Sequence, residues 1–145
     1  MDVELKIDKD ILENKIIIEA NSETEEIIEL YNKLLNDYKK LVCYSEDEKH
    51  FIEYNKIETI YSLDGKVYVK DTDGNEYQLR SRIYELQNTL PNNSFLRISN
   101  SEIVNFDNVE RINLKISGTV LLVFKSGRSA YSSRRYIKKI KEFLK

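Results

Sequence analysis

The stretch FLRISNSEIVN, residues 95–105, follows a Pro-Asn-Asn-Ser turn and mixes two kinds of side chain that rarely share one element. Its apolar members are Phe95, Ile98, Ile103 and Val104, and among them stand Arg97, Ser99, Asn100, Ser101 and Asn105. A buried segment seldom carries so many hydrogen-bonding side chains unless some of them face a partner. We therefore expect some of these polar side chains to face a partner.

The composition favours one domain, or one domain with a small appendage. The chain has 145 residues, of which 41% are hydrophobic and 33% charged, so it can bury a core and remain soluble. It contains no run of 18 apolar residues, and its N-terminus, MDVELKIDKD, is too acidic and too polar for a signal peptide. Cys43 is the only cysteine, which excludes an intramolecular disulfide. We expect a cytoplasmic protein without a cofactor.

The net charge of −2 hides an asymmetry along the chain. Residues 1–60 contain 16 acidic and 8 basic residues, whereas residues 61–145 contain 9 acidic and 15 basic ones. A basic unit attached to an acidic one raises the expectation of an anionic partner, because Lys and Arg contacts to phosphate dominate nucleic-acid affinity. Charge alone leaves open the simpler alternative that both parts are solvated surface.

Residues 1–46 are expected to form a small strand-strand-helix element. The segment 3–7 alternates apolar and charged residues and the segment 15–19 is rich in isoleucine, so both are predicted strands. A helix should follow, with Ser22 as its N-terminal cap. Its apolar face over residues 27–38 either packs on the two strands or forms a seam with a partner helix or a second copy.

A charged turn at 45–49 is the expected boundary, after which a second domain, 47–145, follows. There the pattern changes to short strands, predicted at 57–63, 66–70 and 76–80. An Asp-Gly pair separates the first two of these strands, which is a strong hairpin signal because a primed turn requires positive φ. The three strands are therefore expected to form a meander.

The remainder of this domain alternates helices and strands. A short helix is predicted over 82–90, capped by Ser81 and ended by Pro91. Further strands are expected at 108–113, at 119–125 and from residue 128, separated by Ser-Gly turns at 117–118 and 126–127, before a closing helix with Tyr136, Ile137, Ile140, Phe143 and Leu144 on one face. The predicted fold class is mainly β with short helices, an α+β arrangement.

The residue inventory argues against catalysis. The chain has no GxGxxG, GxxxxGK[ST] or GxSxG motif. Its single histidine, His50, has no second His or Cys nearby, so a structural or surface role is expected for it. Asp71 and Asp73 stand in a turn signature, where aspartate is expected for backbone reasons. Binding is therefore the expected function.

The most basic segment is 126–141, which contains no acidic residue. Its cations are Arg128, Arg134, Arg135, Lys138, Lys139 and Lys141, and Ser132 and Ser133 precede the paired arginines. Hydroxyl groups and arginines at the start of a helix suit phosphates and base edges. The alternative is a helix whose outer face is merely basic.

Together these residues resemble a known family: residues 51–145 look like a LytTR DNA-binding domain, an effector domain of many bacterial regulators. The resemblance rests on the helix ending in Glu85-Leu86, on the stretch 95–105, and on the Tyr-Ser-Ser-Arg-Arg-Tyr-Ile-Lys-Lys-Ile run after a Gly turn. The chain departs from the family pattern at Ser99, Glu102 and Phe106, positions that bear on the target sequence.

The resemblance implies a β domain of about ten short strands that inserts loops, and no recognition helix, into successive major grooves of double-stranded DNA. By position, Asn100 matches a loop asparagine that contacts the DNA, and Arg135 matches an arginine at the final strand-to-helix turn that reads a base. Lys66 matches the contact position of the first hairpin, which here holds a different residue from the family's. Arg97, Ser101 and Ser133 match supporting or phosphate-contacting positions. Arg134, Lys138 and Lys139 of the basic run complete the expected DNA-binding set.

The first 45 residues are too short for a phosphoreceiver domain, so the whole resembles a stand-alone LytTR regulator. The expected function is a sequence-specific DNA-binding transcriptional regulator, and residues 1–46 would form a homodimer or dock an inhibitory membrane protein encoded nearby. A rival from another class is a protein-interaction adaptor held by a membrane-protein partner without direct DNA binding. A small enzyme is the third and weakest alternative.

Overall fold

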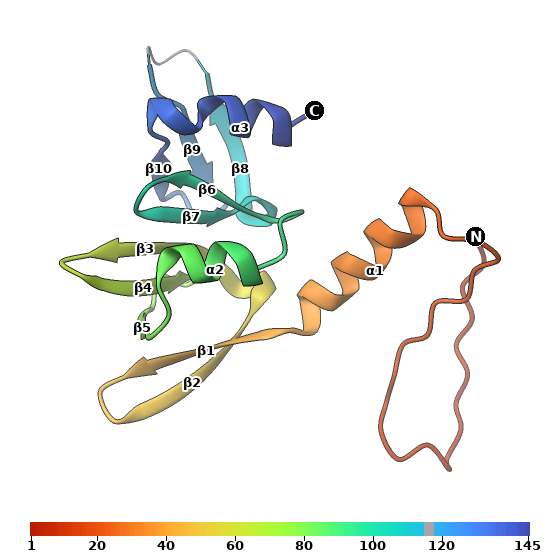
Figure 1. The fold of residues 1–145 in the computed structure, drawn as a ribbon. Coiled ribbons are helices and arrows are strands. Elements are labelled where there is room, and N and C mark those ends of the chain that lie inside the picture. Colours follow the sequence, from red (N-terminus) through yellow and green to blue (C-terminus); the bar gives the residue numbers. More distant parts are fainter. Residues whose placement is uncertain (115–117) are drawn as a thin grey trace.

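Two antiparallel sheets and three α-helices make up the fold in a computed structural model, which describes residues 1–114 and 118–145 (Figure 1). The first sheet consists of β1 (Lys40–Ser45), β2 (Glu48–Glu53), β3 (Ile57–Leu63), β4 (Lys66–Asp71), β5 (Glu76–Leu79), β6 (Phe95–Ser99) and β7 (Glu102–Asn105), in the order β2-β1-β5-β4-β3-β7-β6. The second consists of β8 (Val109–Asn113), β9 (Leu121–Phe124) and β10 (Ser129–Tyr131), in the order β10-β9-β8. The helices are α1 (Glu25–Tyr38), α2 (Ile83–Thr89) and α3 (Ile137–Phe143), with short 3₁₀ turns η1 (Tyr54–Lys56), η2 (Phe106–Asn108) and η3 (Arg134–Tyr136).

The mainly β fold class with short helices is confirmed, and so is the meander, which is β3, β4 and β5. β3 and β4 pair up to Leu63 and Lys66, the residues that flank the turn. Between them Asp64 and Gly65 have φ of 52° and 77°, the geometry of a primed two-residue turn. The turn therefore places Lys66 at the tip of the hairpin.

The stretch 95–105 folds as the β6–β7 hairpin and contributes to two separate cores. Phe95 and Ile103 are buried in the first core, with residues of β3 to β5 and α2. Ile98 and Val104 are buried in the second core, with residues of β9, β10 and α3. Alternate side chains of a strand point to opposite faces, so one hairpin belongs to both halves of the domain.

Side-chain amides that follow the β6–β7 hairpin hydrogen-bond to the backbone at the start of β3. Asn105 is only 1% exposed, and its Nδ2 donates to the carbonyl oxygens of Tyr54 at 3.1 Å and Ile57 at 3.0 Å. Its Oδ1 accepts the backbone N–H of Asp107 at 3.1 Å. Asn108 donates a further bond of 2.7 Å to the carbonyl of Ile57. These bonds fix the start of β3 against the η2 turn that leads into the second sheet.

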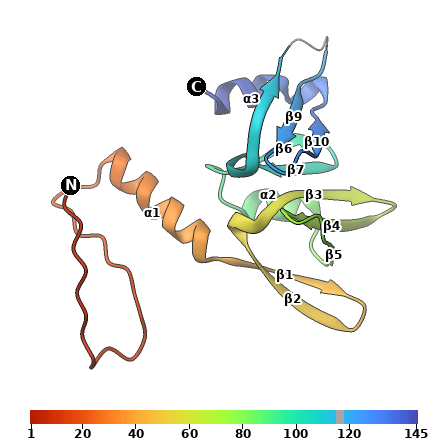
Figure 2. The same cartoon turned by 180° about the vertical axis from the view of Figure 1, so that it is seen from behind.

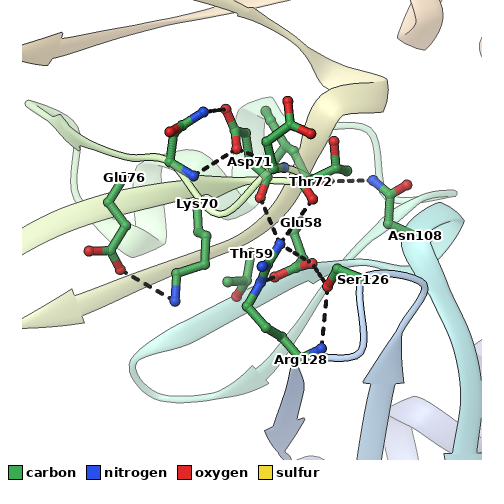
Figure 3. A network of polar contacts seen from close by, with 12 residues as sticks. Glu58, Thr59, Lys70, Asp71, Thr72, Glu76, Asn108, Ser126 and Arg128 are labelled. Atoms are coloured by element: carbon green, nitrogen blue, oxygen red, sulfur yellow. Dashed lines mark hydrogen bonds and ion pairs between the residues drawn. The ribbon is translucent and has the colours of Figure 1, made fainter.

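A buried carboxylate connects the two sheets (Figure 3). Glu58 of β3 is 1% exposed and accepts Arg128 Nε at 2.8 Å and Nη2 at 3.1 Å. Arg128 also donates from Nη2 to the carbonyl of Thr72 at 3.0 Å, and the hydroxyl of Ser126 donates to Glu58 Oε1, the oxygen that also accepts Arg128 Nη2. Ser126 lies in the predicted Ser-Gly turn between β9 and β10, and Arg128 follows it directly before β10, so the connection within one sheet holds a strand of the other. The other predicted Ser-Gly turn, at 117–118, falls partly outside the described residues.

The prediction of two strands at 3–7 and 15–19 is wrong. Among the described residues, those segments form no β pairing, and they lie away from both sheets (Figures 1 and 2). Leu5 is 88% exposed and Ile16 61% exposed. Alternation of apolar and polar residues defines the two faces of a strand, but a strand also needs a neighbouring strand that supplies hydrogen bonds.

The predicted N-terminal helix is present as α1, with a different cap. Thr24 Oγ accepts the N–H of Ile27 at 3.3 Å, so Thr24, not Ser22, caps the helix. Without the two strands, α1 packs mainly beside η1 and β2 within the described residues and projects from the sheet (Figure 1). The cap predicted for the second helix is also wrong, because α2 begins after Arg82 without a side-chain cap bond to Ser81. No helix in the described part of the chain is long and apolar enough to cross a membrane.

The charged turn at 45–49 is a hairpin turn, and β1 on its N-terminal side pairs with β2 along its whole length. β1 also pairs with β5, through Tyr44 and Gln78. The strand before the expected boundary therefore extends the sheet of the domain that follows. Cys43 of β1 is fully buried, and burial raises the pKa of its thiol to about 11, which keeps it protonated and unreactive.

Replacing Arg128 by alanine should destabilise the domain by about 3 kcal/mol, because it leaves the buried Glu58 carboxylate without its cation. The free energy of unfolding from urea titration gives the measurement. Arg111→Ala, which removes an exposed arginine from β8, is the matched control and should stay within about 0.5 kcal/mol of wild type. Equal losses in both variants would show that the pair does not hold the sheets together.

Candidate nucleic-acid interface

Three polar turns lie on the same side of the molecule, opposite α1: the β3–β4 turn, the β6–β7 turn and the connection from β10 into η3 (Figures 1 and 2). Backbone hydrogen bonds tie them to one another. The N–H of Ser62 donates to the carbonyl of Ser101 at 2.8 Å, and the N–H of Ser133 donates to the carbonyl of Ile98 at 2.9 Å. Each turn is thereby anchored to a strand of the adjacent hairpin, which gives the surface a fixed shape.

Asn100 lies at the centre of this surface with its amide oriented. The buried Tyr136 of η3 donates its hydroxyl to Asn100 Oδ1 at 3.0 Å. The oxygen is occupied from the protein side, so the exposed Nδ2 group remains as a donor toward solvent. An amide held in this way presents its N–H donors in a fixed direction, which suits an acceptor on a base edge.

Arg97 holds the β6–β7 turn in place. Its Nε donates to the carbonyl of Ser99 at 3.1 Å and its Nη2 to the carbonyl of Asn100 at 2.6 Å. Its Nη1 donates to Oε1 of Gln87 in α2 at 3.0 Å. With all three nitrogens engaged, Arg97 acts as a support for Asn100, and it contributes positive charge beside the turn.

The hydroxyl of Ser99 stabilises the same turn locally. It accepts the N–H of Ser101 at 3.2 Å, and its oxygen lies 3.4 Å from the Ser101 hydroxyl. Ser99 is one of the positions at which the chain departs from the family pattern. Here a small hydroxyl serves the backbone, and the Ser101 side chain remains exposed beside Asn100.

Several cations around the turns have no internal partner. Lys66, Arg135 and Lys138 are exposed, and within the described residues they form no hydrogen bond or ion pair. Lys139 lies with Nζ 5.6 Å from the ring centre of Tyr136. Unpaired cations on a rigid surface are available for phosphates or base edges without first breaking an internal contact.

Arg134 is packed differently from its neighbour Arg135. A Cβ atom added to Gly118 would lie 2.3 Å from Arg134 Nε, so the guanidinium lies directly on the glycine backbone. Gly118 also has φ of +79°, which other residues rarely adopt. Arg134 is thus placed against the β8–β9 connection, at one end of the surface.

The structure brings most of the sequence-predicted residues together, with unequal roles. Lys66, Arg97 and Asn100 line one cleft, and Ser101 is next to it. Ser133 anchors the start of η3, while α3, which carries Lys138 and Lys139, runs away from the turns (Figure 1). The lysines of α3 can therefore reach only the edge of a partner that lies across the turns.

Sequence reasoning missed four residues at this site. Tyr136 was assigned to an apolar helix face, but its hydroxyl orients Asn100. Gln87, Arg80 and Arg82 come from α2 and the segment before it, and their approach to the turns depends on long-range folding. The only available signal was the run of two arginines around Ser81, in an otherwise neutral segment.

The arrangement offers donors and positive charge. In the described part of the chain, no group of three or more His, Cys, Asp or Glu side chains is placed to hold a metal ion. His50 is used structurally, with Nε2 2.7 Å from the hydroxyl of Ser45 and its ring 4.7 Å from that of Tyr77. The chemistry available at the turns is recognition of an anionic, hydrogen-bonding surface.

A β domain that displays turns bearing amide and cationic side chains is a distinctive class, and comparison with known proteins identifies it. Residues 47–145 match the LytTr DNA-binding domain family. A solved LytTr DNA-binding domain from Bacillus cereus has the same fold, with a TM-score of 0.70 at 23% identity over 73% of this chain and 96% of that one. The chain therefore belongs to the LytTr DNA-binding domain family.

Relatives from Staphylococcus aureus extend the similarity beyond that domain. One from strain NCTC 8325 is 35% identical and covers 99% of this chain and 98% of its own length. One from strain N315 is 35% identical and covers 89% of this chain and 95% of its own length. Both are named uncharacterized HTH-type transcriptional regulators. The similarity reaches into the N-terminal segment, so that segment belongs to the architecture these proteins share.

Glu102 is an acidic group directly beside the β6–β7 turn. It is half-buried in β7, where it accepts a hydrogen bond from the hydroxyl of Thr59. Burial raises the pKa of Glu102 above its usual range, and the Thr59 hydrogen bond offsets this only in part. The folded protein therefore holds this proton to higher pH than the unfolded chain does.

A raised carboxyl pKa makes a definite prediction for stability. The contribution of Glu102 is fully present below its unfolded pKa and is lost as pH rises through its folded pKa. Glu102→Gln should remove this loss, so the stability of the variant relative to wild type, measured by urea unfolding, should increase as pH rises through the folded pKa of Glu102. Glu110→Gln, at an exposed position of β8, is the control. A Glu102→Gln difference that does not change with pH would contradict the assignment.

Proposed function

We propose that this protein is a sequence-specific, DNA-binding transcriptional regulator that inserts its turns into the major groove of promoter DNA. The observation that carries the proposal is the 3.0 Å bond from Tyr136 to Asn100, because it joins two of the three turns and orients a free amide donor. Membership of a family of DNA-binding domains and the names of the relatives support it.

The roles follow from which groups are free and which are engaged. Asn100 and Arg135 are the base readers, since an oriented amide and an unpaired guanidinium both suit purine edges in the major groove. Lys66 adds a contact at the β3–β4 tip. Ser101, Ser133, Arg134, Lys138 and Lys139 contact phosphates, which set the position of the protein on the duplex. Arg97 supports Asn100.

Reading by turns fits this fold better than reading by a helix. Within the described residues no two α-helices are joined directly, as a helix-turn-helix unit would require. α2 has seven residues and buries Ile83 and Leu86, and α1 lies on the side away from the turns (Figure 2). The relatives' helix-turn-helix name therefore does not describe the way in which we propose this chain reads DNA.

For residues 1–46 we propose a role in homodimerisation, within a chain whose DNA-binding part is 47–145. Ile28, Tyr31 and Tyr38 occupy one exposed face of α1. Apolar surface of this kind marks an interaction site, and a second copy would cover it while presenting two sets of turns to a paired DNA site. An inhibitory membrane protein is the competing occupant of the same face.

Arg135→Ala should reduce discrimination between a duplex selected by the wild-type protein from a random library and a scrambled duplex. The expected loss is about 1–3 kcal/mol, confined to one base pair, because a guanidinium fork on guanine is lost. Fluorescence anisotropy with both duplexes measures it. Lys138→Ala serves as the comparison and should weaken both duplexes alike, as loss of a phosphate contact does. Unchanged discrimination in Arg135→Ala would refute its role as a base reader.

Size-exclusion chromatography with light scattering tests the dimer. Wild type should have the mass of two chains, and Ile28→Glu combined with Tyr31→Glu should convert it to one, because charges would then face each other in an apolar seam. Lys33→Glu, an exposed change on the same helix, should remain dimeric. A monomeric wild type, with and without DNA, would exclude a dimer through α1.

A further inference from the structure

A cleft of about 530 Å³ opens beside the β6–β7 turn and is lined by cations without a matching acid. Its wall is formed by the β3–β4 turn and by the segment that connects β5 to α2. The four cations are Lys66, Arg80, Arg82 and Arg97, and no aspartate or glutamate lines the cleft. Such an arrangement is unfavourable for the protein alone and favourable for a bound anion.

Two of these cations, Arg80 and Arg82, were not among the site residues predicted from the sequence. Arg80 and Arg82 are exposed, and neither forms a hydrogen bond or an ion pair within the described residues. Arg97 differs from them, because two of its nitrogens donate to the β6–β7 turn and the third donates to Gln87 of α2. Together with Lys66, the two arginines give the cleft three cationic groups whose N–H donors are not used in hydrogen bonds or ion pairs within the described residues.

The β1–β2 hairpin holds Arg80 in place. The guanidinium carbon of Arg80 lies 3.8 Å from the ring centre of Tyr44, which belongs to β1. Tyr44 is itself fixed, since it pairs with Gln78 of β5. A guanidinium stacked on an aromatic ring keeps its plane while its in-plane N–H groups remain available, an arrangement suited to phosphate.

We infer that this cleft binds backbone phosphate of the DNA, outside the bases read by the turns, and that Tyr44 is a positioning residue for Arg80. The inference rests on the proposed function, because Asn100 and Lys66 at the rim of the cleft are the residues assigned to the DNA surface. A duplex that contacts Asn100 runs past the cleft, so a neighbouring phosphate is the anion within reach. The β1–β2 hairpin thereby contributes to DNA binding without touching DNA.

The salt dependence of binding tests the two arginines. With the selected duplex and the full chain, Arg80→Ala and Arg82→Ala should each reduce the slope of log K against log salt by about 0.9, the value for one phosphate contact. The ratio of affinities for selected and scrambled duplexes should stay at the wild-type value. Arg111→Ala, from β8 on the second sheet, should leave the slope unchanged. Wild-type slopes for both cleft variants would overturn the inference.

Neutral phosphate analogues locate the contact. In a series of duplexes with single methylphosphonate substitutions, one position should weaken wild type but not Arg82→Ala, because the partner of that phosphate has been removed. If every position that weakens wild type weakens Arg82→Ala equally, the cleft does not hold a phosphate. A different result refutes the proposed function, namely an Arg135→Ala variant that still discriminates between the selected and the scrambled duplex. If wild type selects no duplex at all, both proposals fall.

A double-mutant cycle tests the role of Tyr44. Tyr44→Leu should weaken DNA binding, and Tyr44→Phe, which retains the ring, should restore it. In an Arg80→Ala background, Tyr44→Leu should have no further effect on DNA affinity, whatever it does to stability. Equal weakening in both backgrounds would show that Tyr44 acts through the fold alone and would refute its positioning role.

Discussion

The ion pair between Glu58 and Arg128 is the constraint on which the geometry of this domain depends. The two sheets share no strand pairing among the described residues, so their relative position rests on side-chain contacts and on isolated backbone bonds such as that from Ser133 to Ile98. Glu58 is buried in β3, and both of its oxygens are satisfied by the β9–β10 turn (Figure 3). Buried pairs of this kind add little net stability, but they admit one geometry only, because any other leaves a charge unpaired. The pair therefore fixes the β9–β10 turn against β3, and the bonds from Ser133 to Ile98 and from Tyr136 to Asn100 hold η3 against the β6–β7 hairpin.

Because the two sheets are fixed relative to each other, the polar turns keep a defined arrangement. The β6–β7 hairpin sends Ile103 into one core and Ile98 into the other, so its turn moves with neither sheet alone. Arg97 then holds the carbonyl of Asn100, and Tyr136 holds its side-chain oxygen. Base recognition by an amide needs orientation as well as proximity, and here the orientation is set before any partner binds.

Sequence reasoning succeeded where the physical cause was local. Asp64 and Gly65 specify a turn by their own backbone preferences, and family resemblance located Asn100 at a loop tip. It failed where a distant partner decides the outcome. Alternation predicted strands at 3–7 and 15–19, but within the described residues these segments pair with no sheet edge. The first helix begins two residues later than predicted, so Thr24 caps it and Ser22 does not. Nor could any local pattern show that Arg97 would turn inward or that Arg80 would lie on Tyr44.

The charge asymmetry of the chain also becomes intelligible in three dimensions. An overall charge of −2 would argue against a nucleic-acid partner if the charges were mixed over one surface. They are not mixed, since α1 and the acidic residues before it lie on the side opposite the three turns (Figures 1 and 2). At physiological ionic strength, charges farther apart than about 8 Å are largely screened from each other. A phosphate at the turns would therefore respond to the nearby cations, Lys66, Arg135 and the cleft arginines, and only weakly to the acidic residues on the opposite side of the molecule.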